Sequence, residues 1–136
     1  DAEMTITVCK PAQLLALQAH AGYLDRGTGS AHFVYYSDAK PSSLDIAANP
    51  DNALCVLFLP EPCFKQVLSD GIELFPTESA LATKAGTVQW ARLYNGNNEP
   101  YADFTVGTSD AHIILNSLNI AVGSSQKLDS IIFNPL

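Results

Sequence analysis

The stretch that decides the fold of this chain is residues 86–133, GTVQWARLYNGNNEPYADFTVGTSDAHIILNSLNIAVGSSQKLDSIIF. In this stretch, short apolar and β-branched runs alternate with Gly, Asn, Ser and Asp at a spacing of about 8–12 residues, which is typical of β-sandwiches and barrels. Residues 101–106 alternate strictly, so Phe104 and Val106 share one face of a strand and are expected to be buried. The stretch predicts an all-β, mainly antiparallel fold of the β-sandwich or jelly-roll kind.

The N-terminal half is expected to add one short helix, a hairpin and a long loop. Pro11 suits the first turn of a helix, and apolar residues follow it at helical spacing, which predicts a helix over residues 12–21 that packs on the sheet. Asp70-Gly71 between two apolar runs predicts a β-hairpin. Prolines, serines and asparagines in residues 38–52 predict a surface loop. Strands are expected at residues 4–8, 31–37, 53–59, 64–68, 72–75, 88–94, 101–106, 113–115, 118–122 and 128–133.

Length and composition bound the organisation of the chain. Its 136 residues predict one domain, residues 1–136. Met4 is the only methionine, which favours Met4 as the native start and residues 1–3 as an added remnant. Charged residues make up only 15% of the chain, against roughly 25% in typical soluble domains. This low fraction fits either burial of surface against partners or a simply apolar domain.

The charge pattern argues against two classes of partner. The formal net charge is −7, and the seven Lys and Arg residues are spread singly along the chain. Binding to phosphate backbones needs clustered basic residues, so no nucleic-acid partner is expected. The sequence has neither a basic amphipathic helix nor an apolar run near the roughly 18 residues that span a bilayer, so no membrane partner is expected.

The cysteines predict where the chain is made. Cys9, Cys55 and Cys63 are an odd number, whereas secreted disulfide frameworks normally use an even one. The N-terminus also lacks the charged and apolar regions of a signal peptide. Both observations favour free thiols in a chain synthesised in the cytoplasm. A Cys55–Cys63 bridge is the alternative, if those two runs pair as neighbouring strands.

No catalytic, cofactor or metal site is expected from the motifs. The spacing of the carboxylates singles out no pair for glycoside hydrolysis. The three histidines lie far apart in the sequence and form no metal-ligand motif. The glycines form neither of the phosphate-binding patterns. The thiols lie at the terminus or in core-like runs, which are poor settings for a thiolate nucleophile.

One strand suggests a binding surface. Trp90, Arg92 and Tyr94 fall on the same face of a strand by period two, and Tyr101 follows on the next strand. An aromatic and guanidinium strip of this kind binds sugars or extended chains through stacking and cation–π contact. The competing interpretation places Trp90 in the core, covered by the aliphatic part of Arg92.

From Ala85 onward the chain resembles a family of small structural proteins of tailed bacteriophages and prophages. The resemblance is carried by residues 86–96 (GTVQWARLYNG), 103–109 (DFTVGTS), 113–116 (IILN) and 118–123 (LNIAVG). Earlier in the chain, the helix, the glycine turn, the strand at His32–Tyr36 and the proline-containing loop are similar in layout. The chain departs from the family pattern at residues 110–112 and 55–76. The resemblance implies a compact β protein of the virion, without catalytic residues.

Two functions are therefore expected from the sequence. The first is a virion structural protein, made in the bacterial cytoplasm, that binds itself or other virion proteins in capsid decoration, a connector or a tail. The uncharged edges at residues 113–115 and 118–122 are expected to be covered by such a partner. The alternative is a carbohydrate- or receptor-binding β module. An enzyme is not expected.

Overall fold

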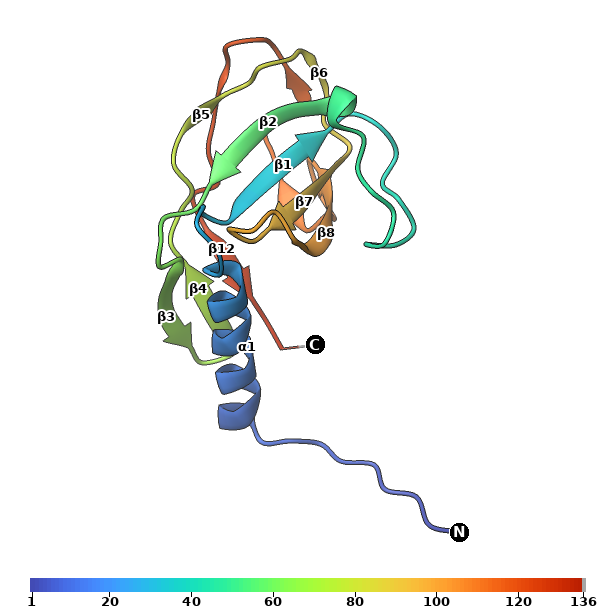
Figure 1. Ribbon diagram of the computed structural model, residues 1–136, viewed down its shortest axis with the longest axis vertical. Coiled ribbons are helices and arrows are strands. Elements are labelled where there is room, and N and C mark those ends of the chain that lie inside the picture. The colour runs from blue at the N-terminus through green and yellow to red at the C-terminus, as the bar shows by residue number, and fades with distance from the viewer. Residues whose placement is uncertain (136) are drawn as a thin grey trace.

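The computed structural model describes residues 1–135 and confirms an all-β fold with one short helix (Figure 1). Within this range the chain forms one α-helix, one 3₁₀ turn and twelve strands. The elements are α1 (Lys10–Leu24), β1 (His32–Tyr36), η1 (Pro50–Asn52), β2 (Ala53–Phe58), β3 (Phe64–Leu68), β4 (Gly71–Leu74), β5 (Ala80–Leu81), β6 (Gly86–Thr87), β7 (Trp90–Tyr94), β8 (Pro100–Gly107), β9 (Ile113–Ile114), β10 (Asn119–Ile120), β11 (Ser125–Gln126) and β12 (Ile131–Phe133).

The main sheet has five strands in the order β2-β1-β7-β8-β9. All neighbours in it are antiparallel except β8 and β9, which run parallel. Side chains alternate between the two faces, so one face contributes Phe33, Tyr35, Leu57, Ala91 and Leu93 to the main core. These residues are fully or almost fully buried. Strands β1 and β7 are buried on both faces, because Val34, Tyr36 and Trp90 form a second core on the other side of the sheet.

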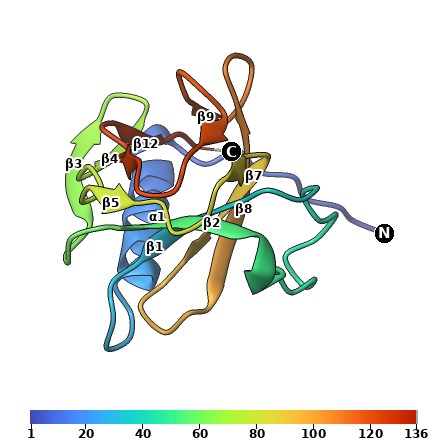
Figure 2. The same ribbon diagram turned by 90° about the horizontal axis from the view of Figure 1, so that it is seen from above.

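A second sheet of three strands, in the order β12-β4-β3, stands beside α1 (Figure 2). The predicted hairpin is confirmed, with Leu68 paired to Gly71 across the turn. Gly71 is required here because a Cβ at this position would collide with the carbonyl oxygen of Phe133 on β12. Ile72 and Leu74 of β4 are fully buried. Two further pairs, β10 with β6 and β11 with β5, are only two residues long.

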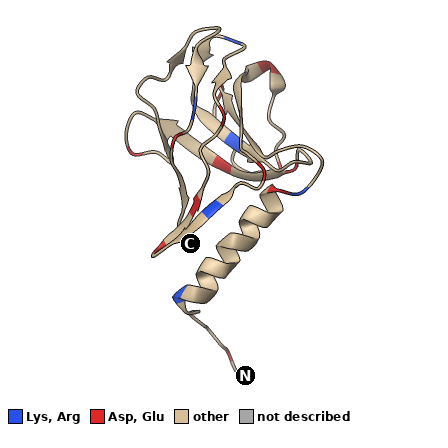
Figure 3. Ribbon diagram, turned by 90° about the vertical axis from the view of Figure 1, so that its left-hand side faces the viewer, with Lys and Arg blue, Asp and Glu red and all other residues tan. Residues whose placement is uncertain are grey.

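Helix α1 is longer than the predicted residues 12–21. It begins one residue before Pro11 and continues through Gly22 to Leu24. Its buried side is formed by Leu17, Ala21 and Leu24, and burial of Leu24 extends the helix past the glycine. Between Lys10 and Asp25 the helix carries no charge, as Figure 3 shows. The C-terminal half of the helix packs on the main core, whereas most helix residues before position 17 are exposed.

The turn between β7 and β8 is built around a buried asparagine. Asn95 is fully buried; its side-chain oxygen accepts from the backbone N–H groups of Asn97 and Glu99, and its amide donates to the Glu99 carboxylate. Gly96 touches the loop before β1, where the Gly29 N–H donates to the Gly96 carbonyl at 3.1 Å. A Cβ on Gly96 would collide with the Gly29 carbonyl. This packing pins the predicted turn against the end of α1.

Several sequence predictions need correction. Residues 4–8 form no strand, because the extended segment has no neighbouring strand to pair with and is exposed along its whole length. The runs at 113–115, 118–122 and 128–133 give strands of only two or three residues. Val106 is 8% exposed, as predicted, whereas Phe104 is half-buried. Phe104 packs on Phe33 at 5.7 Å between ring centres, but its other side borders a cavity.

Candidate functional site

The predicted binding strip on β7 is largely buried under the loop of residues 38–49. Arg92 is 2% exposed, and its guanidinium donates to both carboxylate oxygens of Asp103, at 2.6 and 3.0 Å. It also donates to the backbone carbonyls of Ile46, at 2.8 Å, and of Ser43, at 3.5 Å. The hydrogen bond with Asp103 raises the pKa of Arg92 above its ordinary value. Arg92 therefore holds the loop on the sheet and is too deeply buried to contact a ligand.

Trp90 occupies a second, smaller core on the same face of the sheet. Its ring is fully buried, stacks on Tyr36 with 4.5 Å between centroids, and lies 5.2 Å from the guanidinium carbon of Arg92. The indole N–H donates to Asp38 at 3.0 Å. Tyr94 is half-buried and shares a hydrogen bond of 2.8 Å with the Tyr36 hydroxyl. The interpretation of Trp90 as a core residue is thus confirmed.

Tyr101 lies on the opposite face of the sheet from Arg92. An irregularity in the β7–β8 pairing places Tyr94 opposite Pro100 and so reverses the side-chain direction of Tyr101. The Tyr101 hydroxyl shares a 2.8 Å hydrogen bond with His20 of α1, and its ring stacks on Phe133 at 5.8 Å. Trp90, Arg92, Tyr94 and Tyr101 therefore do not form one surface. A one-residue shift in register cannot be read from the alternation of residues 100–106.

A patch of rings remains exposed at the other end of the Trp90 face. His32 stacks on Tyr94 and contacts Phe58, each with 5.3 Å between ring centroids. Phe58 is 44% exposed, and Val56 lies beside it on the same strand face. We call His32, Val56, Phe58 and Tyr94 the ring patch; of the residues predicted for the binding strip, it contains only Tyr94.

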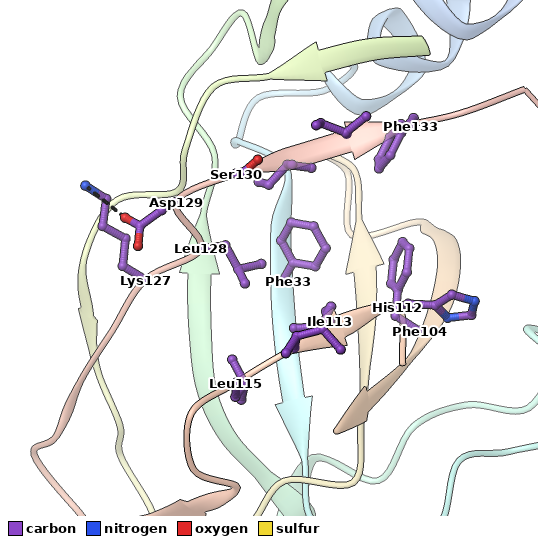
Figure 4. Close-up of a pocket in the computed structure, with 13 residues that line it drawn as sticks. Phe33, Phe104, His112, Ile113, Leu115, Lys127, Leu128, Asp129, Ser130 and Phe133 are labelled. Carbon is purple, nitrogen blue, oxygen red and sulfur yellow. Dashed lines mark ion pairs between the residues drawn. The ribbon is translucent and has the colours of Figure 1, made fainter. Parts of the chain in front are cut away.

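A groove lies on the other side of the molecule, between the edge of the five-stranded sheet and the edge of the three-stranded sheet (Figure 4). It contains a cavity of about 500 Å³ between β9 and β12. Phe33 and Leu128 lie between β12 and Ile113 of β9 in this view, and all three line the cavity. Among residues 1–135, the only charged side chains that line this cavity are Lys127 and Asp129, which form a loose ion pair at 3.8 Å.

The groove continues toward α1 as a second cavity of about 760 Å³. Phe104, His112, Ile132 and Phe133 line both cavities, so the two are continuous around β12. Val8 at the base of the N-terminal segment and apolar side chains of α1, such as Leu17, close the far wall. We call this continuous depression the β12 groove.

Both walls of the β12 groove are edge strands. Strand β9 ends the main sheet and β12 ends the three-stranded sheet. The β9 wall is fixed by reciprocal hydrogen bonds of 3.0 Å, in which Thr105 N–H donates to His112 Nδ1 and His112 N–H donates to the Thr105 hydroxyl. Ile114 and Ile132 are 55% and 50% exposed. The sequence signal for this site was the absence of charge in residues 113–115, which indicated an unprotected edge but not its partner.

Residues 1–9 form an extended arm that points away from the body of the protein (Figure 1). Met4, Ile6 and Val8 alternate with Thr5 and Thr7, and the three apolar side chains are 82%, 63% and 47% exposed. The base of the arm is fixed where the Gln13 amide donates to the Val8 carbonyl at 3.2 Å. The arm therefore keeps the period-two pattern of a strand without a strand to pair with.

Within residues 1–135, no group of three or more His, Cys, Asp and Glu side chains is placed to hold a metal ion. In the same part of the chain, no helix has the length and apolar character needed to cross a membrane.

The cysteines are all free, with Cys9 exposed and Cys55 and Cys63 buried. The Cys63 thiol donates from Sγ to the Ala21 carbonyl at 3.7 Å, and the residue is fully buried. Burial, together with the nearby Asp25, raises the pKa of the Cys63 thiol from 9.0 to about 12. Burial also raises the pKa of Cys55.

Alkylation should therefore distinguish the thiols. In native protein without reductant, iodoacetamide should modify Cys9 alone, because thiolate is the reactive form and the other two thiols are buried. Unfolded protein should take up label at all three, and a two-dalton mass deficit would contradict free thiols. An unfolded thiol ionises near pH 9 and the folded Cys63 near pH 12, so its contribution to stability is complete below pH 9 and falls as the pH rises through that window.

No family model, no curated protein and no solved structure matches this chain, so its function has to be argued from the arm, the edge strands and the groove that the structure brings together.

Proposed function

We propose that this chain is a structural protein of a tailed-phage or prophage virion, which acts through assembly with other proteins and performs no reaction. The observation that carries the proposal is the combination of an exposed apolar arm with a groove between two edge strands. An edge strand offers unpaired backbone N–H and C=O groups to another chain, and natural proteins normally protect such edges with charge. Neither β9 nor β12 carries a charged residue.

The exposed apolar residues support the same proposal. Ile6, Leu15, Ile114 and Ile132 are all at least 50% exposed, and they lie on the arm, the outer side of α1 and the two walls of the groove. Apolar side chains on edges and on an unpaired segment are typical of surfaces that become buried in an assembly. The resemblance to phage structural proteins supplies the biological setting, with synthesis in the host cytoplasm and residence in the capsid decoration, connector or tail.

Particles made by the phage or prophage that encodes the chain provide the test. We expect the chain in density-gradient-purified particles, in a fixed ratio to the major capsid or tail proteins by quantitative mass spectrometry. A matched comparison is the same lysate before particle assembly, where the chain should be free. A chain that is abundant in the lysate but absent from the purified particles would rule the virion proposal out.

The ring patch favours a second candidate, a carbohydrate- or receptor-binding module. Stacked aromatic rings on a sheet face bind sugars through their apolar faces, and Phe58 is 44% exposed. Phe58→Ala should remove glycan binding and leave the melting temperature nearly unchanged, with Val67→Ala, 46% exposed on β3, as the matched control. Glycan-array signal that survives Phe58→Ala, or no signal for the native chain, would exclude this candidate.

A further inference from the structure

The arm and the β12 groove are complementary parts of one molecule. The arm offers three apolar side chains, Met4, Ile6 and Val8, on one side of an extended backbone. The groove offers an apolar floor between two edge strands that have no further partner in the described residues. An extended segment placed between β9 and β12 would complete the ladder that the two sheets leave open.

The arm is long enough to run along both edge strands of the groove. Five residues of strand, Met4 to Val8, span about 17 Å at roughly 3.3 Å per residue. This length exceeds that of β12, which has three residues, and of β9, which has two. A strand that occupies the groove presents alternate side chains to the floor and to solvent. Met4 and Ile6 would then contact Phe33 and Phe104 of the second copy, while Thr5 and Thr7 would stay in water. Val8 lines the α1 side of the groove in its own chain and marks the point where the arm leaves its own body.

The charges also agree. The segment from Met4 to Val8 carries no charge, which suits the apolar floor. At the rim of the groove, Lys127 and Asp129 offset each other's charge as a loose ion pair at 3.8 Å. In the part of the chain that the structure describes, no negative side chain other than Asp129 lines the cavity between β9 and β12.

We propose that the arm of one copy inserts as a strand into the β12 groove of a second copy. The inference rests on the proposed assembly function and names its partner. The occupant is a second copy because the chain itself holds both halves of the interface, and because the arm leaves α1 in a direction away from its own body (Figure 1). A contact of arm to groove joins two different surfaces, so repetition of it generates rings or filaments, which are the forms that connectors and tails need.

Sedimentation across a concentration series tests this proposal on the full chain, with reductant present to keep Cys9 from forming bridges. The native chain should associate beyond the 14.6 kDa monomer. Ile6→Asp should weaken association by at least about 100-fold, because it places a carboxylate on the apolar floor. Thr7→Asp is the matched control, since it adds the same charge one residue away on the solvent side, and it should weaken association by less than about 10-fold.

The groove side has its own pair of variants. Ile132→Asp, on β12, should weaken association as strongly as Ile6→Asp, whereas Val122→Asp, at a position 65% exposed outside the groove, should not. Hydrogen exchange provides the second readout. Amides of the arm and of β12 should become protected together as the concentration of the native chain rises. Equal effects of Ile6→Asp and Thr7→Asp, or an arm that exchanges at the same rate at all concentrations, would overturn the proposal.

The outcomes separate this inference from the proposed function. A strict monomer that is nevertheless present in purified particles would overturn arm exchange between copies and leave the virion proposal in place. An oligomer that depends on Ile6 but is absent from particles would support arm exchange and overturn the virion proposal.

Discussion

Replacement of Arg92 by leucine should lower the free energy of unfolding by about 3–5 kcal/mol, the cost of leaving one member of a buried ion pair without its partner. Arg92 and Asp103 have side chains that are only 2% and 8% exposed, so neither charge is solvated in the folded state. Arg92→Leu leaves the Asp103 carboxylate buried without its two guanidinium bonds. It also removes the donors to Ile46 and Ser43, so the loop of residues 38–49 should become sensitive to protease.

Urea denaturation measures the lost free energy of unfolding, and two control variants show whether the loss comes from the buried ion pair. Lys65→Leu breaks the exposed pair of Lys65 with Glu73, at 3.7 Å, and should change stability by no more than about 1 kcal/mol. The double variant Arg92→Leu with Asp103→Leu removes both buried charges and should be more stable than Arg92→Leu alone. A single variant as stable as Lys65→Leu would show that the Arg92–Asp103 pair is solvated in solution.

Trp90→Ala should destabilise the protein by about 3–5 kcal/mol through the cavity that it leaves. The indole is fully buried between Tyr36, Arg92 and the loop, and its N–H donates to Asp38. A loss of this size is a large part of the roughly 5–15 kcal/mol that stabilises a domain. Loss of any ligand binding in this variant would therefore report unfolding, and Phe58 is the position at which binding by the ring patch can be tested.

The matched control for Trp90→Ala is Leu81→Ala, at a position that is 64% exposed on β5. It should change the midpoint of urea unfolding only slightly. If both variants shift the midpoint equally, the loop of residues 38–49 does not cover Trp90 in solution. Intrinsic fluorescence offers an independent check, because the single tryptophan should emit as a buried indole until the main transition.

The candidate site was only partly predictable from the sequence. The absence of charge in residues 113–115 and the alternation of residues 4–8 are local properties, and both indicated strands without protection. The alternation of residues 4–8 predicts a strand of the fold. A local pattern shows that a segment can pair as a β-strand, but it does not show whether another strand lies close enough to pair with it. In the structure, the segment of Met4, Ile6 and Val8 pairs with no other strand of the described residues, and these side chains are exposed.

By itself, the sequence determined the fold class, the hairpin at Asp70-Gly71 and the turn at Asn95, because turn chemistry and the two-residue period of a strand act over short distances. Only the tertiary structure decided which faces are covered. The loop of residues 38–49 buries Trp90 and Arg92, and a register irregularity turns Tyr101 away from them toward α1. Likewise, the groove exists because β9 and β12 become the facing edges of two sheets. Residues 115–130 separate these two strands in the sequence. Such pairings depend on contacts between distant segments, which no local pattern specifies.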